Sequence, residues 1–119
     1  NLGDERIINL EILAQLRMHL DEAMVHEVYE EFVKETAQFL EESKQKNWDI
    51  RKSHMHTIKG NAATLGLEQI AQIASKIDSD LKKKITADFD LDFTKLTAAF
   101  EIYCTEYKNI LNIHTEVNA

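Results

Sequence analysis

The sequence contains no proline, only three glycines and a single cysteine. Without proline nothing in the chain forces a break in a long helix, and the scarcity of glycine favours helices for the same reason. One cysteine, Cys104, excludes an intramolecular disulfide, so a reducing compartment is the natural setting. Because Cys104 lies in an apolar helical stretch, we interpret it as an unreactive core thiol. These absences favour an all-helical domain.

Long apolar runs and an excess of positive charge are also missing. No stretch approaches the roughly 20 apolar residues of a membrane-spanning helix, and no signal peptide opens the chain. The net charge of −7 disfavours binding to a phosphate backbone, which needs a basic face. We therefore expect a cytoplasmic domain with no nucleic-acid partner and no membrane contact of its own. A first residue Asn1 leaves open a module of a longer protein, with any membrane tether outside this chain, or a processed or engineered terminus.

Hydrophobic residues recur at helical spacing in five segments, and none alternates as a strand does. The predicted helices cover about residues 5–20, 21–46, 47–66, 68–84 and 92–114. Short connections favour antiparallel packing of neighbouring long helices. The expected fold class is all-α, an antiparallel four-helix bundle with a short extra N-terminal helix. The 119 residues are expected to form one domain, residues 1–119, with a core of about 7–114.

Polar residues and glycine at the predicted boundaries agree with these ranges. Asp21 and Asn47 are predicted N-caps, because their side chains can accept hydrogen bonds from free helix N–H groups. Gly66 is a predicted stop signal for the third helix. Lysines 82–84 are expected to end the fourth helix, where cations favour the helix dipole.

Two patterns resemble metal sites but lack residues that such sites require. Asp88 to Asp92 has the D-x-D-x-D spacing of a calcium loop, yet Phe93 replaces the glycine at position six and Ala99 the glutamate at position twelve. We interpret this segment as a linker and helix cap. None of the five histidines follows a glutamate by three residues, as a di-iron bundle requires. We therefore expect no metal site.

His56 stands out on a helical wheel of the third segment. The arc that must face the core contains Trp48, Met55, Ile58, Ala62 and Leu65. His56 points about 130° away from the centre of that arc, toward solvent. Its neighbours one turn away are Lys52, Lys59, Gly60 and Ala63. Gly60 costs the helix about 1 kcal/mol relative to alanine, so we interpret it as making room for a partner that comes close to His56.

The other four histidines are interpreted as surface or helix-flank residues: His19, His26, His54 and His114.

The segment His56-Thr-Ile-Lys59-Gly60, followed by Gly66, is similar to the H-x-x-K-G-x-x-x-x-x-G signature of histidine-containing phosphotransfer (HPt) domains. The resemblance extends to the opening residues 9–16 and to the helical segments 32–40 and 67–74, and it covers about residues 7–111. It implies a phosphorelay intermediate of two-component signal transduction. In that role a histidine accepts a phosphoryl group from the aspartyl phosphate of one receiver domain and passes it to the aspartate of another.

The resemblance assigns roles to individual residues. It implies that His56 is phosphorylated at Nε2, that Lys59 steadies the phosphoryl oxygens, and that Gly60 clears room for the receiver's active-site loops. Further candidates are Lys52 and Lys82 for the phosphate, and Ala63 and Ser75 for partner docking. The expected partners are receiver domains of response regulators or hybrid sensor kinases. We expect a monomer that needs no cofactor, because magnesium would belong to the receiver, and that has no ATP-dependent kinase activity.

Asp78 departs from the family pattern. Several members of the family have a glutamine at the position 22 residues beyond the histidine, where it can hydrogen-bond the imidazole, and this sequence has Asp78 there. One interpretation is a solvated carboxylate that pairs with Lys82 four residues later. The other is a carboxylate that orients His56. The sequence leaves both open.

Two other functions compete with the phosphorelay interpretation. One is a degenerate HPt-like bundle that docks receivers or other proteins without carrying phosphate. The other is a purely structural bundle within a larger protein. The sequence does not name the receivers or the direction of phosphate flow, nor does it separate a free-standing protein from the C-terminal module of a hybrid sensor kinase.

Overall fold

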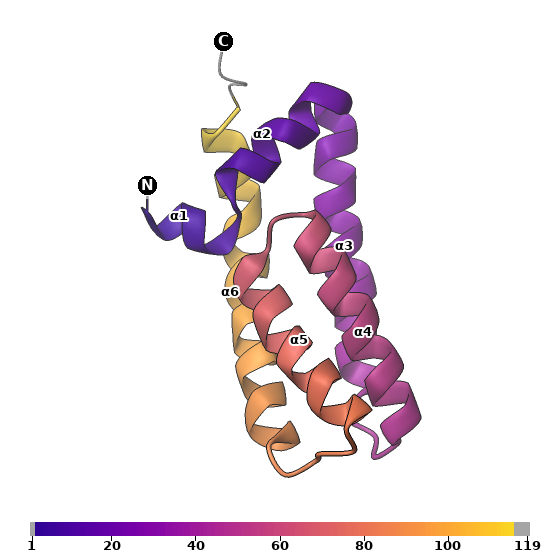
Figure 1. Ribbon diagram of the computed structural model, residues 1–119. Coiled ribbons are helices and arrows are strands. Elements are labelled where there is room, and N and C mark those ends of the chain that lie inside the picture. Colours follow the sequence, from indigo (N-terminus) through magenta and orange to yellow (C-terminus); the bar gives the residue numbers. More distant parts are fainter. Residues whose placement is uncertain (1, 116–119) are drawn as a thin grey trace.

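A computed structural model describes residues 2–115, and the described part of the chain is helical throughout, with no strand. The six helices are α1 (Leu2–Ile7), α2 (Leu10–His19), α3 (Glu22–Glu42), α4 (Trp48–Thr64), α5 (Glu68–Lys82) and α6 (Phe89–Ile113). The four long helices α3 to α6 run side by side as a bundle (Figure 1). This confirms the all-α bundle that the hydrophobic spacing predicts.

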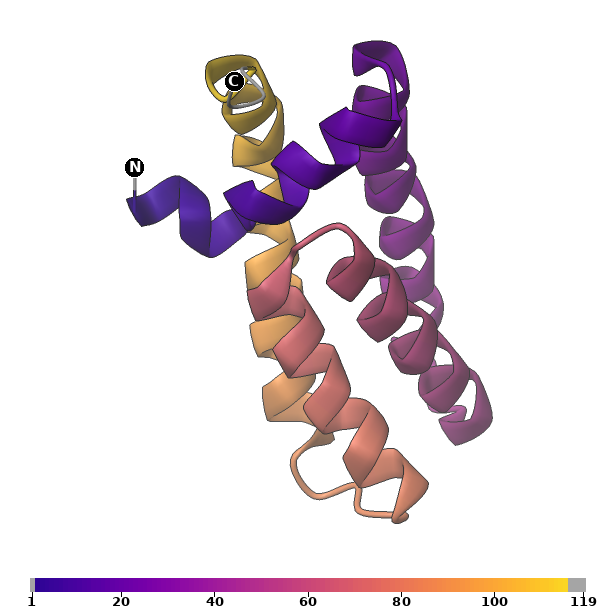
Figure 2. The same ribbon diagram turned by 45° about the horizontal axis from the view of Figure 1, so that its top comes forward.

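The long helices are arranged as a ring in chain order. Helix α4 packs most closely on α5, α5 on α6, and α3 closes the ring against both α4 and α6. The two short helices lie obliquely across the bundle near one end, α1 against α5 and α6 and α2 against α3 (Figures 1 and 2). The surface of α4 that faces away from the bundle is therefore open to solvent along its length.

The N-terminal segment forms two helices where the sequence predicted one. The break lies at Asn9, whose extended backbone conformation ends the helical path and whose side-chain oxygen accepts hydrogen bonds from the N–H groups of Glu11 and Ile12. The Asn9 N–H donates to the carbonyl oxygen of Gly66 at 2.8 Å. Asn9 is thus the N-cap of α2 and ties it to the turn between α4 and α5.

Most other boundaries agree with the sequence, and one does not. The side chains of Asp21 and Asn47 cap α3 and α4 as predicted. Helix α6 begins at Phe89, so residues 89–92 form its first turn and the linker interpretation of that segment is wrong. The reason is packing, because Phe89 is buried and stacks on Phe93 with ring centroids 5.3 Å apart. Helix α5 ends at Lys82, two residues before the predicted end.

Two tyrosines tie the centre of the bundle together. The Tyr29 hydroxyl donates to the carbonyl oxygen of Leu65 at 2.8 Å, and the Tyr103 hydroxyl donates to the carbonyl oxygen of Tyr29 at 2.9 Å. Both side chains are fully buried, so these bonds satisfy polar groups that would otherwise be costly to bury. Cys104 is half-buried on α6, and burial together with the nearby Glu101 charge raises the pKa of its thiol.

The first turn of α4 is fixed by a buried guanidinium. The guanidinium of Arg51 lies over the rings of both Trp48 and Phe89, with its Cζ atom 4.6 Å and 4.2 Å from the two ring centroids. Its Nε–H donates to the carbonyl oxygen of Ser43 at 2.9 Å. These contacts hold the start of α4 against α6 and the α3–α4 connection. They set the rotation of α4 about its axis, and with it the direction in which His56 points.

Candidate functional site

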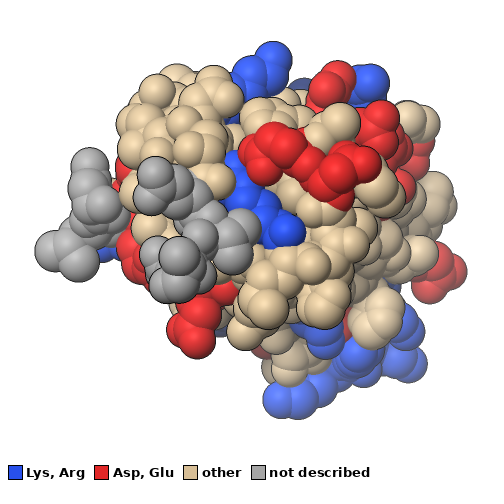
Figure 3. Space-filling model, turned by 90° about the horizontal axis from the view of Figure 1, so that it is seen from above, with Lys and Arg blue, Asp and Glu red and all other residues tan. Residues whose placement is uncertain are grey.

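His56 lies on the solvent-facing side of α4. Its side chain is 61% exposed, whereas Met55, Ile58 and Ala62 on the opposite side of the helix are fully buried. The helical wheel therefore predicted the direction of this histidine correctly. Lys52, one turn earlier, is also exposed. Seen from the end that α2 crosses, Lys and Arg side chains gather at the lower right of Figure 3.

A buried carboxylate lies beneath the exposed histidine. Asp78, on α5, is 1% exposed, and one of its oxygens, Oδ2, is surrounded by three nitrogen atoms. These are His56 Nδ1 at 3.4 Å, Lys59 Nζ at 3.2 Å and Lys82 Nζ at 3.0 Å. The pairing with Lys82 agrees with the sequence, but the interpretation of Asp78 as a solvated carboxylate is wrong. The close packing of α4 on α5 places Asp78 under the surface and within reach of His56.

The surroundings of Asp78 favour its ionised form. Burial is the largest single influence and raises the pKa of this carboxyl, but hydrogen bonds from Lys82, Lys59 and His56 together outweigh it. The pKa of Asp78 therefore lies below its usual value. The other carboxylate oxygen, Oδ1, is buried and has no hydrogen-bond partner within residues 2–115. All the polar contacts of the carboxylate are thus made by Oδ2, on the side of the imidazole and the lysines.

The contact to Asp78 determines which ring nitrogen of His56 is available. The 3.4 Å separation is a long hydrogen bond, in which Nδ1–H donates to the carboxylate. A neutral imidazole with its proton on Nδ1 carries its free electron pair on Nε2. The arrangement thus presents an exposed nucleophilic nitrogen, with a carboxylate behind the ring and two ammonium groups beside it.

The surface next to His56 is shallow and has little side-chain bulk. Gly60 is exposed, and a Cβ atom built on it would have no neighbouring atom within 4 Å. A hollow of about 530 Å³ runs between α4 and α5, and its lining includes Lys59, Ala63 and Ser75. The structure thus brings Ala63 and Ser75, two of the residues proposed for docking, into one hollow. Within residues 2–115, no contact from outside its own helix requires glycine at position 60.

Two of the histidines that were interpreted as surface residues are packed against the protein. The His54 side chain is only 16% exposed, stacks on Phe39 with ring centroids 4.4 Å apart, and bonds to Glu42 at 2.7 Å. His114 bonds to Asp4 at 2.9 Å. His54 is therefore not the surface residue that the sequence predicted, whereas His114 flanks a helix as predicted, as the C-cap of α6. Neither partner can be inferred from spacing along one helix. For His54 the packing also means that its ring is far less accessible than that of His56.

The aspartates around position 90 form an ion cluster with a lysine. Lys76 on α5 bonds to Asp80, Asp88 and Asp92 at 3.0, 3.3 and 2.7 Å. The hydrogen bonds that Lys76 donates to these carboxylates, that to Asp92 foremost, raise the pKa of Lys76. The carboxylate oxygens of the three aspartates lie within 4.8 Å of one another, close enough to hold a metal ion. The ammonium group of Lys76 already lies among them. The cluster joins α5 to the start of α6, where Asp92 is buried.

Sequence reasoning missed a second hollow beside the site, between α3 and α4. Its lining includes Glu31 and Glu35 on α3 and Asn61 and Thr64 on α4. On separate helical wheels these residues are ordinary polar positions. Only the packing of the two helices brings them together. An asparagine in the middle of a helix, where its propensity is poor, is the one local signal that was available.

Comparison with known proteins agrees with the geometry. A family model described as Hpt domain matches residues 9–101, most of the chain. The chain therefore belongs to the Hpt domain family, whose members are phosphotransfer modules of two-component systems that interact with receiver domains. A search of curated proteins and a search of solved structures each found no match. Within residues 2–115, no helix is both long and apolar enough to cross a bilayer.

Proposed function

We propose that the chain is a phosphorelay intermediate in which His56 Nε2 carries the phosphoryl group. The observation that carries this proposal is the exposed imidazole of His56 above a buried carboxylate, with Nδ1 oriented toward Asp78 at 3.4 Å. Among the described histidines, His56 combines exposure with an ordered ring partner and neighbouring lysines. Family membership makes a receiver domain the natural donor and acceptor.

The transfer step uses the electron pair on Nε2. That pair attacks the phosphorus of a receiver's aspartyl phosphate, the N–P bond forms, and the bond from phosphorus to the aspartate oxygen breaks, so that the aspartate leaves as a carboxylate. The ring keeps its proton on Nδ1 and gains positive charge. Asp78 stabilises that charge from behind, through the contact that also orients the ring. Onward transfer reverses the same bonds with the aspartate of a second receiver.

Lysines near His56 would offset the charge of the phosphoryl group. Lys59 and Lys82 are bound to Asp78 Oδ2, and their side chains are 35% and 50% exposed, so their ammonium groups are accessible from outside. Lys52 supplies a further exposed cation on the same side of α4. Transfer of this kind depends on positioning and charge neutralisation, and the magnesium ion that completes the site would come with the receiver.

Substitution of the two neighbouring histidines tests the proposal. A receiver labelled with radioactive phosphate as its aspartyl phosphate is mixed with the wild-type chain, with His56→Gln and with His54→Gln. We expect acid-labile, base-stable label on the wild type and on His54→Gln, and none on His56→Gln. We also expect no label when the chain is given ATP alone.

Stability measurements separate loss of chemistry from loss of fold. The melting temperature of His56→Gln should stay close to that of the wild type, because the side chain is exposed. His54→Gln should melt earlier, because it loses a ring stack worth about 0.5–1.5 kcal/mol. Label that persists on His56→Gln would overturn the assignment. A wild-type chain that binds receivers but never takes up label would leave a docking module without phosphate as the function.

A further inference from the structure

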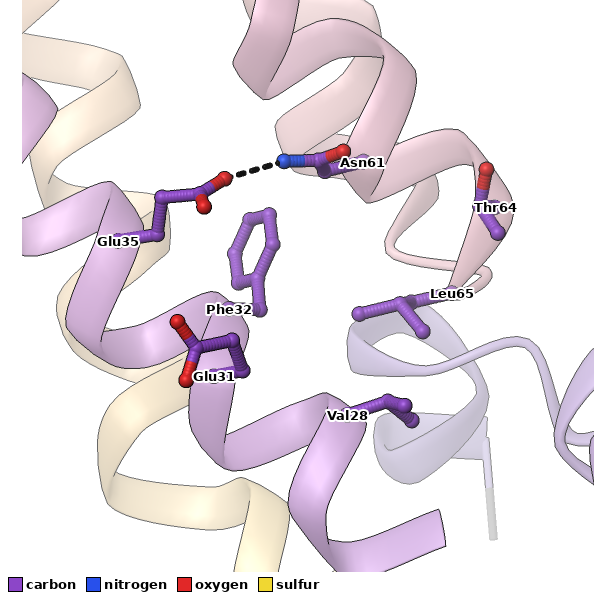
Figure 4. Close-up of a pocket in the computed structure, with 7 residues that line it drawn as sticks. All are labelled: Val28, Glu31, Phe32, Glu35, Asn61, Thr64 and Leu65. Carbon is purple, nitrogen blue, oxygen red and sulfur yellow. Dashed lines mark hydrogen bonds between the residues drawn. The ribbon is translucent and has the colours of Figure 1, made fainter. Parts of the chain in front are cut away.

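A partly apolar pocket of about 310 Å³ opens between α3 and α4, beside the face that carries His56. Its lining is Val28, Glu31, Phe32, Glu35, Asn61, Thr64 and Leu65 (Figure 4). Phe32 and Leu65 are 3% and 7% exposed, so the inner wall belongs to the hydrophobic core. Figure 4 shows the Phe32 ring between the two helices, with the carboxylates of Glu31 and Glu35 on the α3 side.

The charges around this pocket are of one sign. Glu35 is held in place by Asn61, whose amide donates to its carboxylate at 2.7 Å. Glu31 is exposed, and within residues 2–115 its side chain makes no hydrogen bond or ion pair. The lysine nearest along α3, Lys34, does not line the pocket and pairs with Glu30 at 3.4 Å. The pocket therefore combines an aromatic wall with two carboxylates and no cation.

The pocket lies within the reach of a partner that docks on His56. Asn61 and Thr64 are five and eight residues beyond His56, which is about 8 and 12 Å along the helix axis. A protein that buries about 800 Å² on its side of an interface covers a patch of roughly 16 Å radius. A receiver centred on His56 would therefore reach the side of the pocket that Thr64 lines, which lies about 80° around the helix from His56.

We propose that this pocket takes one Lys or Arg side chain of the receiver that docks at His56, and thereby selects among receivers. The inference rests on the proposed function and deepens it. The methylene stem of such a side chain fits against Phe32, and its charged end meets Glu31 and Glu35. The sign of the charge reverses between the lysines near His56 and the carboxylates of this pocket. A receiver with the complementary pattern, negative where it meets the lysines and positive where it meets the carboxylates, is therefore favoured in one orientation.

Charge removal at the pocket tests the proposal. The probe is the receiver domain that, among those encoded in the source genome, labels His56 fastest. Single-turnover transfer is measured over a range of receiver concentrations for the wild type, for Glu31→Gln and for Glu101→Gln. The last variant removes one exposed carboxylate from α6, which lies across the ring from α4.

We expect Glu31→Gln to raise the half-saturating receiver concentration about tenfold, with the saturated transfer rate unchanged, because the pocket binds the partner and does not touch the phosphoryl group. The increase should shrink at high salt, and Glu101→Gln should behave as the wild type. Each Lys and Arg of the receiver is then replaced by alanine in turn. One of these substitutions should raise the half-saturating concentration with the wild-type chain but cause no further increase with Glu31→Gln.

The outcomes separate this proposal from the assignment of His56. Wild-type concentration dependence in Glu31→Gln, with His56 still labelled, overturns the pocket and leaves the phosphorelay function standing. Absence of label from the wild type overturns both. If sedimentation shows that the chain alone forms dimers that Glu31→Gln dissociates, the occupant is a second copy and the proposal is wrong. Glu31→Gln and Glu101→Gln should melt at the wild-type temperature by circular dichroism, which would show that a change in receiver binding does not come from misfolding.

Discussion

Two glycines stand six residues apart in one sequence motif, and their surroundings in the structure are opposite. Gly66 is buried in the turn between α4 and α5, at φ +76°, and a Cβ atom there would lie 3.1 Å from side-chain atoms of Asn9 and Ile12. Gly60 is exposed in the middle of α4, and a Cβ atom there would meet nothing within 4 Å. One glycine is required by the protein's own packing, and the other is not.

The comparison shows that a glycine alone in a sequence does not reveal its purpose. At Gly66 the left-handed backbone conformation and the close approach of α2 both exclude a side chain. At Gly60 the chain accepts a residue of poor helix propensity without any internal contact in return. An external partner that comes close to His56 would give that cost a reason, and the access interpretation of Gly60 stays a prediction. Four substitutions test this difference, from the largest expected effect to the smallest.

Gly66→Ala should have the largest effect on stability. A left-handed conformation costs an ordinary residue about 1–2 kcal/mol, and crowding against Asn9 and Ile12 adds about 1–3 kcal/mol. We therefore expect the free energy of unfolding in urea to fall by about 2–5 kcal/mol. A fall of less than half a kilocalorie per mole would mean that the turn adapts easily, and the contrast between the two glycines would disappear.

Gly60→Gln should leave the fold intact and impede transfer. The side chain would project into open space next to His56, where a docking receiver must approach, so transfer from a phosphorylated receiver should slow at least tenfold. Reaction of His56 with a small phosphoryl donor such as phosphoramidate should be unchanged, because it needs no docking. Equal transfer by Gly60→Gln and the wild type would remove the access interpretation.

Asp78→Asn extends the comparison to a side chain buried beneath the exposed face. Loss of the negative charge beside the ammonium groups of Lys59 and Lys82 should lower stability by about 1–3 kcal/mol at neutral pH. Because the pKa of Asp78 is lowered in the folded protein, its ionised form stabilises the fold. That contribution is fully present above the ordinary value of 3.8 and is lost as the pH falls below it. The difference between wild type and variant, measured by urea unfolding, should therefore shrink below pH 4; a constant difference would contradict the linkage.

The same variant should change the chemistry of His56. Without the carboxylate, fewer rings keep the proton on Nδ1, which nitrogen chemical shifts of the imidazole would report. A phosphorylated ring that loses this proton more readily is a poorer leaving group, and the repulsion between Asp78 and the phosphoryl group is gone. We expect a longer lifetime for the phosphorylated form. If neither the shifts nor the lifetime moves, Asp78 only holds the lysines.

Gly60→Ala should have the smallest effect and the opposite sign. Alanine gains up to about 1 kcal/mol of helix propensity over glycine, and nothing in the protein opposes the added methyl group. We expect a slightly higher melting temperature with nearly normal transfer. A lower melting temperature would show that the helix around Gly60 is not free to accept a side chain.

Much of the fold could be predicted from the sequence because it depends on local spacing. The apolar residues at helical intervals gave the long helices, and the caps at Asp21 and Asn47 marked two of their starts. The break at Asn9 was missed even though asparagine is a good N-cap, because the bond that fixes it comes from Gly66, 57 residues away in the chain. The start of α6 was missed because Phe89 was not expected to reach the core.

For the site, the sequence by itself predicted that His56 faces solvent, because helical periodicity gives the angle of a side chain relative to the core face. The motif shared with the family, and not that angle, made His56 the candidate for phosphorylation. The glycine and the lysines beside it follow from the same spacing of one turn.

Only the tertiary structure decided what lies behind and beside that histidine. Asp78 is buried because α5 packs on α4 at that position. The pocket at Glu31 lies between α3 and α4, where Asn61 holds Glu35 across the two helices. Both depend on the rotation and separation of helices that are far apart in the chain. Those quantities are fixed by interlocking side chains across the core, and the periodicity of a single helix carries no record of them.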